Sequence, residues 1–234
     1  MPLAALLLAS FALAAGAPKP PPFLPKTAKP VVVSVESGGR KLAATWRAPR
    51  RGMPVLVLAH GVGAGRSEWE KFASRLSARG FGSLAVDLRG HGGSSAHEGE
   101  WKEFDAKGEW PRLVDDLLAA ASWVEAKGVE PERVAFAGAS IGANLAAAAD
   151  ARRPGRFLVL LSPGIDYRGV RLTMRRVSKT LAVAARADAY AFDAVSELGK
   201  HGVTTLEAPG GHGAGALDDE KTLGRVLDWL AKPR

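Results

Sequence analysis

The segment Gly138-Ala139-Ser140-Ile141-Gly142 places a serine between two glycines, in the pattern Gly-x-Ser-x-Gly. The apolar stretch Arg133 to Ala137 comes before it, and the alanine-rich run Ala143 to Ala149 follows it. A strand, a tight turn at a serine and a helix form a nucleophile elbow, which holds the hydroxyl clear of the sheet. Glycines on both sides of the serine let strand and helix pass close together. We therefore interpret Ser140 as a candidate nucleophile.

An aspartate and a histidine follow two later apolar stretches. Asp188 comes just after Leu181 to Ala185, and His212 comes after Thr204 to Glu207 with a glycine on each side. An attacking serine needs an adjacent base, and imidazole takes up and releases protons near neutral pH. A carboxylate can hold the imidazole in the required tautomer. The order Ser140, Asp188, His212 is therefore compatible with a catalytic triad.

The rest of the chain alternates between short apolar stretches and helix-forming segments. The predicted strands are residues 31–35, 42–46, 55–59, 83–86, 134–137, 157–161, 181–185 and 204–207. The predicted helices are residues 68–79, 113–127, 141–151, 189–200 and 217–230. Continuous apolar strands indicate a mostly parallel sheet covered on both faces. Its ligands would lie at the carboxyl ends of the strands, where all three candidate residues fall.

Taken together, these features resemble the α/β-hydrolase superfamily over residues 31–234. The residues that carry the resemblance are His60-Gly61, Asp87 to Gly92, Gly138 to Gly142, Ala187-Asp188 and Gly211-His212-Gly213. The resemblance is closest to small members such as dienelactone-hydrolase-like and serine-aminopeptidase-like hydrolases. It implies an α/β-hydrolase fold, with a mostly parallel central sheet, helices on both faces, no separate cap domain and serine-hydrolase chemistry.

The expected oxyanion hole consists of two backbone N–H groups, those of Val62 and Ile141. Ile141 directly follows the nucleophile, and Val62 follows His60-Gly61 at the end of an earlier strand. His60 is expected to brace this loop. One alternative concerns the acid: Asp166 follows the strand 157–161, where some members of the superfamily place their carboxylate. We favour Asp188 over Asp166.

Composition narrows the classes of function. The 234 residues suffice for one sizeable α/β core, and the absence of cysteine excludes disulfides, thiolate catalysis and thiolate-bound zinc. The formal net charge is +8, but lysines and arginines are scattered, so we expect no nucleic-acid partner. Histidines and carboxylates lack metal-ligand spacing, and we expect neither a metal nor a cofactor. The expected partner is a small-molecule acyl substrate; the oligomeric state is left open.

The N-terminal region reads as a targeting segment and a linker. Residues 3–13 are apolar but too short to span a bilayer comfortably, and small residues follow them, so we predict a signal peptide over residues 1–17. No lysine or arginine precedes the apolar run, which is atypical of such a signal. Residues 18–30 contain six prolines and are predicted to form an extended linker. The protein is expected to be periplasmic or secreted, without stable membrane insertion, if the signal functions, and cytoplasmic otherwise.

Two segments are candidates for shaping the substrate site. Residues 162–180 are too few for a helical cap domain, so an open site is expected. Trp101, Phe104 and Trp110 would either wall an apolar pocket or pack their segment down. Four arginines would either attract an anionic substrate or form a solvated helix face, which is the interpretation we favour; they are Arg168, Arg171, Arg175 and Arg176.

The leading hypothesis is a serine hydrolase that cleaves carboxylic esters through an acyl-enzyme. The same triad serves thioesters and amides. One alternative is an acyltransferase, in which an alcohol or amine replaces water. A second alternative is a non-catalytic binding protein that retains the fold, which the complete set of Ser140, Asp188 and His212 disfavours.

Overall fold

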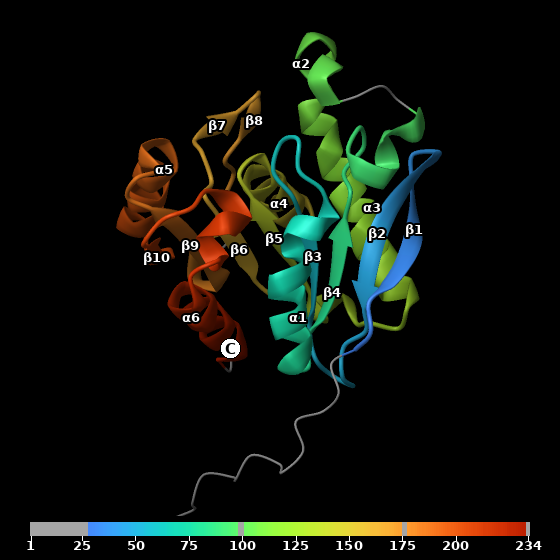
Figure 1. The fold of residues 1–234 in the computed structure, drawn as a ribbon, viewed down its shortest axis with the longest axis horizontal. Helices are drawn as coiled ribbons and strands as arrows, with labels where there is room; N and C mark the ends of the chain where they lie inside the picture. Colours follow the sequence, from blue (N-terminus) through green and yellow to red (C-terminus); the bar gives the residue numbers. More distant parts are fainter. Residues whose placement is uncertain (1–27, 98–100, 175–176, 233–234) are drawn as a thin grey trace, which may run out of the picture.

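In the computed structural model, eight strands form one sheet in the order β1-β2-β4-β3-β5-β6-β9-β10 (Figure 1). The structure describes residues 28–97, 101–174 and 177–232. β2 pairs antiparallel with β1 and β4, and all other neighbouring strands are parallel. The strands are β1 (Val31–Ser37), β2 (Arg40–Arg47), β3 (Val55–Ala59), β4 (Gly82–Val86), β5 (Val134–Ala139), β6 (Leu158–Leu161), β9 (Thr180–Ala185) and β10 (Thr204–Ala208).

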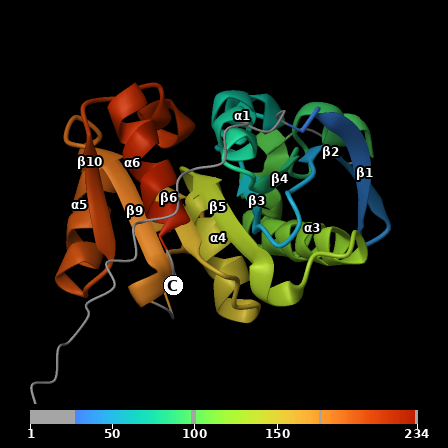
Figure 2. The same cartoon turned by 90° about the horizontal axis from the view of Figure 1, so that it is seen from below.

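Helices cover both faces of the sheet, as expected. Figure 2 shows α1 and α6 on one side and α3 and α4 on the other. The apolar side chains of α5 join the core on the side of α3 and α4. The bounds of the helices are α1 (Glu70–Ala78), α3 (Leu113–Ala126), α4 (Ile141–Arg152), α5 (Ala189–Lys200) and α6 (Glu220–Ala231).

The central strands are apolar along their whole length because both of their faces are buried. All five residues of β3 are buried. Val55, Val57 and Ala59 join the core beneath α3 and α4. Leu56 and Leu58 join the second core, beneath α1 and α6. The alternation of side chains along a strand thus divides the apolar residues between two cores.

Two predicted helices begin differently from the sequence expectation. The segment at 68–79 begins as a short 3-10 helix, η1 (Arg66–Trp69), which leads into α1. The helix predicted at 217–230 begins later, as α6, because Leu217 ends a separate 3-10 helix, η7 (Gly213–Leu217). Asp219 caps α6, since its carboxylate accepts the N–H of Thr222 at 2.7 Å. This cap explains why the α-helix begins only after Asp219.

The segment between β6 and β9 is small, and no cap domain is present in the described part of the chain. It holds a two-stranded hairpin, β7 (Asp166–Tyr167) and β8 (Val170–Arg171), followed by η6 (Val177–Lys179). The prediction that the four arginines form a solvated helix face was wrong, because Arg168 and Arg171 lie in this hairpin. Arg168 pairs with Asp105, and Arg175 and Arg176 lie outside the described residues.

The segment between β4 and α3 consists of short helical turns, with α2 at the top of Figure 1. These turns are η2 (Gly92–His97), η3 (Trp101–Glu103), α2 (Phe104–Lys107) and η4 (Trp110–Arg112). A further turn, η5 (Pro131–Arg133), leads into β5. The segment follows the carboxyl end of β4, whose neighbours in the sheet are β2 and β3.

The predicted signal peptide at 1–17 and most of the predicted linker at 18–30 lie outside the described residues. Ala28 is fixed to the domain at both of its backbone polar groups. Its N–H donates to Ser77 Oγ at 2.8 Å, and its carbonyl accepts a hydrogen bond from Arg47 at 3.0 Å. No helix within the described residues has the length and apolar character needed to cross a bilayer.

Candidate active site

Ser140 lies in a sharp turn between β5 and α4. Its backbone has φ 55° and ψ −126°, a strained conformation for a residue with a side chain. The two glycines of the motif allow this turn. A Cβ on Gly138 would lie 1.9 Å from the carbonyl oxygen of Gly142, and one on Gly142 would lie 2.3 Å from that of Ala59. Only glycine fits at either position, because the start of α4 is in direct backbone contact with β5 and with the end of β3.

Asp188 and His212 are brought together from the ends of two strands. Asp188 follows β9 and precedes α5, and His212 lies between β10 and η7. His212 Nδ1 is 2.7 Å from Asp188 Oδ2. The Asp188 side chain is 17% exposed and that of His212 is 50% exposed. The carboxylate is thus largely enclosed, while the ring has one side open to solvent.

The loop that carries His212 packs directly on the serine turn. A Cβ on Gly213 would lie 3.3 Å from Ala139 Cβ and 3.6 Å from the nitrogen of Ser140. The N–H of Gly213 donates to Ser162 Oγ at 2.9 Å in the interior. His212 therefore belongs to a loop fixed within contact distance of the candidate nucleophile.

Asp166, the alternative acid, makes different contacts. It lies in β7, where its carboxylate accepts the N–H of Gly169 at 2.8 Å and lies 3.5 Å from Arg171 Nε. Its own N–H donates to the hydroxyl of Tyr190. These contacts stabilise the hairpin, and the carboxylate that meets His212 is that of Asp188.

The predicted oxyanion donors lie on two elements that meet beside Ser140. A Cβ on Gly61 would lie 3.4 Å from Ser140 Cβ, which places the loop of Val62 against the serine. Ile141 is the first residue of α4, so its N–H lacks an acceptor within the helix. Both residues therefore lie on segments that meet the serine, and their N–H groups remain the candidate oxyanion donors.

Two titratable groups, the buried His60 and the partly buried Glu68, hold the loop that follows β3. His60 Nδ1 lies 2.7 Å from the carbonyl oxygen of Gly61, and His60 Nε2 accepts the N–H of Leu88 at 3.0 Å. Burial, together with the nearby His91, lowers the pKa of His60 to about 4. The ring is therefore neutral at pH 7 and connects two loops, which is the bracing role expected of His60.

Glu68, in η1, contacts the same loop from the other side. Its Oε1 accepts the N–H of Gly61 at 3.1 Å. Burial raises the pKa of Glu68 to about 7, and the hydrogen bond from Gly61 opposes that rise. A carboxylate that changes charge near neutral pH therefore lies one residue from Val62.

A family model described as serine aminopeptidase, S33, matches residues 51–197. This stretch makes up more than half of the chain and contains both Ser140 and Asp188, but it ends before His212. The chain belongs to the serine aminopeptidase S33 family. This is a hydrolase family of the α/β-hydrolase superfamily, so the resemblance noted in the sequence is confirmed.

Solved hydrolase structures share the fold of this S33-family chain. Dienelactone hydrolase from Anabaena variabilis is 19% identical, with a TM-score of 0.63 over 86% of this chain and 94% of that one. An esterase from Pyrococcus furiosus is 18% identical, with a TM-score of 0.61 over 87% and 92%. An esterase from Pyrobaculum calidifontis is 18% identical, with a TM-score of 0.61 over 86% and 85%. The expected α/β-hydrolase fold is therefore confirmed.

Curated relatives match a shorter stretch of the S33-family chain. Two uncharacterized proteins from strains of Mycobacterium tuberculosis are each 32% identical over 111 residues. The matched stretch is 47% of this chain and 36% of each relative, so it spans about a third of their length.

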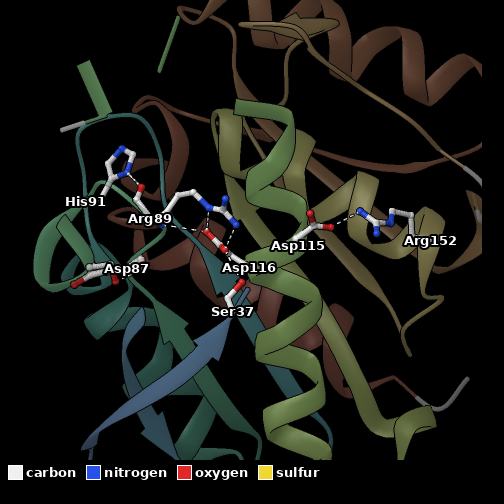
Figure 3. A network of polar contacts seen from close by, with 8 residues as sticks. Ser37, Asp87, Arg89, His91, Asp115, Asp116 and Arg152 are labelled. Carbon is white, nitrogen blue, oxygen red and sulfur yellow. Dashed lines mark hydrogen bonds and ion pairs between the residues drawn. The ribbon is translucent and has the colours of Figure 1, made fainter. Parts of the chain in front are cut away.

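The motif Asp87 to Gly92 of the S33-family chain forms a buried polar network at the end of β4 (Figure 3). The guanidinium of Arg89 donates to both carboxylate oxygens of Asp116, from Nε at 3.0 Å and from Nη2 at 2.6 Å. Ser37 Oγ donates to the same carboxylate at 2.8 Å. Asp87 accepts the N–H groups of Arg66 and Gly93. These contacts fix the loop beside β3. Asp87 and Arg89 therefore have a structural role.

The three aromatic residues after β4 were expected either to wall an apolar pocket or to pack their own segment down, and the structure shows both cases. Phe104 and Trp110 are buried in the core and pack their segment onto the sheet. Trp101 is partly buried and stacks on His91, with ring centroids 5.8 Å apart. Together with Gly63 it lines a shallow pocket beside the Val62 loop. Only Trp101 therefore remains available to shape a substrate site.

The sequence analysis missed Glu68, Tyr167 and Asn144. The amide of Asn144 Nδ2 donates to the carbonyls of Gly164 and Val170, both at 2.8 Å, and so fixes the hairpin to α4. Asn144 interrupts an alanine-rich helix, a visible sign of a buried polar role. For Tyr167 the only signal was rarity, since the chain has two tyrosines. Within the described residues, no cluster of three or more His, Asp or Glu could hold a metal ion.

Proposed function

We propose that this S33-family protein is a serine hydrolase that cleaves carboxylic esters through an acyl-enzyme. The observation that carries the proposal is the contact of the His212 ring with Asp188, in a loop packed on the strained turn of Ser140. An esterase and a dienelactone hydrolase of the same fold give further support.

In the proposed reaction, Ser140 Oγ attacks the carbonyl carbon of the ester while His212 takes up its proton. His212 then delivers that proton to the alcohol oxygen as it leaves, which produces the acyl-enzyme. Water attacks the acyl-enzyme by the same route in reverse. Asp188 holds the tautomer of His212 and stabilises the imidazolium in both halves of the reaction.

The negative charge that develops on the carbonyl oxygen would be stabilised by the N–H groups of Val62 and Ile141. Donors of this kind are effective because they are fixed in place before the charge appears. The contacts of the Val62 loop with His60 and Glu68 supply that rigidity. Losing one such donor typically lowers turnover about 10²- to 10³-fold.

The proposed substrates are small or exposed acyl groups. The hairpin of β7 and β8 is the largest described insertion between β6 and β9, and it leaves half of the His212 side chain exposed. The family description names an aminopeptidase, so amide cleavage at an amino-terminal residue is the second candidate activity. Both activities use the same nucleophile and base.

The first test is labelling of the purified full-length chain with a fluorophosphonate probe, which reacts with an activated serine. We expect labelling of the wild-type protein and none of Ser140→Ala, with unchanged circular dichroism in the variant. Activity is then compared on p-nitrophenyl esters and on an amino-acid p-nitroanilide. A folded wild-type protein that fails to react with the probe would refute the proposal.

A further inference from the structure

The phenol of Tyr167 lies beside the turn that carries Ser140 and interacts with the Ser140 side chain. Tyr167 is the last residue of β7 and is partly buried, packed against the core near α4. Its hydroxyl donates to the carbonyl oxygen of Ser162 at 3.4 Å, a long contact, and the preceding residue, Leu161, accepts the N–H of Ser140 at 2.8 Å. The phenol is therefore held at the serine turn, and its weak contact with Ser162 leaves the O–H able to rotate toward Ser140 Oγ.

The hairpin that carries Tyr167 is held in place from the helix that Ser140 begins. Asn144 lies one helical turn after Ser140 and is fully buried. Besides donating to the carbonyls of Gly164 and Val170, its Oδ1 accepts the N–H of Gly164 at 3.2 Å. The three hydrogen bonds fix the hairpin relative to Ser140, because Asn144 belongs to α4 and Ser140 directly precedes that helix.

The ring of Tyr167 is held by a second tyrosine. The rings of Tyr167 and Tyr190 meet edge to face, with centroids 5.5 Å apart and planes at 71°. Tyr190 Oη donates to the carbonyl of Asp166 at 2.8 Å and accepts its N–H at 3.0 Å. A Cβ on Gly164 would lie 2.5 Å from Tyr190 and 2.7 Å from Tyr167. The orientation of the phenol is therefore set by packing.

Backbone strain is concentrated around this contact. Among the described residues, the non-glycine residues with positive φ are Ser140 at 55°, Ser162 at 49° and Arg168 at 53°. Arg168 follows Tyr167 in the hairpin turn. Ser162 faces Tyr167 with its carbonyl and binds the N–H of Gly213 with its hydroxyl. Strain of this kind is tolerated chiefly where a functional geometry requires it.

The protonation state of the phenol suits it to donate. Burial, followed by the negative charge of Asp188 nearby, raises the pKa of Tyr167 to about 12. The hydroxyl therefore keeps its proton at neutral pH. In the acyl-enzyme Ser140 Oγ is an ester oxygen without a hydrogen, so the phenol is the only member of the pair that can donate.

We propose that Tyr167 is a further catalytic residue, which donates its O–H to Ser140 Oγ when that atom is the leaving group of deacylation. This inference rests on the proposed serine-hydrolase function. When the tetrahedral intermediate collapses, the bond between the acyl carbon and Oγ breaks, and its electron pair returns to Oγ. Tyr167 stabilises the charge as it forms, and the proton that completes the serine hydroxyl comes from His212. Tyr167 itself keeps its proton throughout.

The test is Tyr167→Phe, which keeps the ring and removes only the hydroxyl. On p-nitrophenyl acetate we expect kcat to fall about 10- to 100-fold, the loss typical of one hydrogen bond to a charged oxygen. Because acylation is affected less than deacylation, rapid-mixing experiments should show a burst of p-nitrophenol larger than that of the wild type. The rate of fluorophosphonate labelling should stay within about threefold, since labelling requires no departure of Oγ.

The matched control is Tyr190→Phe, the same change in the partner ring. It removes the hydroxyl that binds Asp166, and it should leave kcat within about twofold, since that hydroxyl has no contact with Ser140 among those described. An unchanged kcat in Tyr167→Phe, an equal loss in both tyrosine variants, or a labelling rate that falls as far as kcat would each overturn the role of Tyr167. Labelling of the wild type at Ser140 would then still support the proposed function. A wild-type protein without labelling refutes both.

Discussion

His212 Nδ1 and Asp188 Oδ2 lie 2.7 Å apart, although 24 positions separate them along the chain. The contact depends on the parallel pairing of β9 with β10, which brings the ends of the two strands to one edge of the sheet. Asp166, on the neighbouring hairpin, is bound instead to Gly169 and lies near Arg171.

We therefore expect Asp188→Asn to lower turnover far more than Asp166→Asn does. An amide at position 188 would favour the wrong tautomer of His212, which in a serine triad costs about 10⁴-fold in kcat. Steady-state kinetics on one p-nitrophenyl ester would measure both variants, with circular dichroism to confirm folding. The reverse ranking would assign the acid to Asp166.

The turn at Ser140 should tolerate no side chain at its first glycine. Gly138→Ala would place a methyl group 1.9 Å from the carbonyl oxygen of Gly142, so we expect a loss of about 3 kcal/mol or more in unfolding free energy. Gly224→Ala is the control, since nothing lies within 4 Å of its Cβ position in α6. There the change should stabilise the protein by about 0.5–1 kcal/mol. Urea denaturation would measure both, and equal effects would contradict the described packing.

The charge of Glu68 should make stability depend on pH. The folded chain holds the Glu68 proton up to a pKa of about 7, whereas the unfolded chain releases it near 4.5. The unfolded state therefore binds fewer protons between those values, and this group lowers the free energy of unfolding as pH rises from about 4.5 to 7. His60, whose pKa is lowered to about 4, acts in the opposite direction below pH 6.5.

Glu68→Gln removes one of these two contributions. Between pH 4.5 and 7 the free energy of unfolding of Glu68→Gln should rise relative to that of the wild type. The gain should be at most about 3 kcal/mol, because each unit of pKa difference corresponds to about 1.36 kcal/mol. Urea denaturation at a series of pH values from 4 to 8 would measure the difference. The exposed Glu132 gives the control variant Glu132→Gln, which should follow the wild-type pH dependence. A difference between Glu68→Gln and the wild type that stays constant with pH would contradict the prediction.

The adjacent residues Asp115 and Asp116 should differ sharply in their contribution to stability. Asp116 is fully buried against Arg89, so Asp116→Asn leaves a buried cation without its partner and should cost about 3–5 kcal/mol (Figure 3). Asp115 pairs with Arg152 in an exposed position, and Asp115→Asn should cost about 1 kcal/mol at most. Thermal unfolding of the two variants measures the contrast. Similar melting temperatures would show that Arg89 is accommodated without Asp116.

Much of the framework could be predicted from the sequence because its signals are local. Apolar runs marked the strands of the sheet, and β3 and α5 were predicted with the bounds that the structure has. The glycines around Ser140 and His212 marked positions where chain segments approach closely. The order of Ser140, Asp188 and His212 predicted which strand ends would carry the candidate site, while their roles await the labelling and kinetic tests.

Only the tertiary structure decided which side chains meet at that site. Neither the contact of Glu68 with Gly61 nor the position of Tyr167 beside the serine turn leaves a periodic pattern in the sequence. The hairpin of β7 and β8 has strands of two residues each, too short for an alternating pattern, and Asn144 on a distant segment fixes its position. Local propensity thus determined the elements of this protein, whereas the position of the phenol depends on hydrogen bonds between segments far apart in the chain.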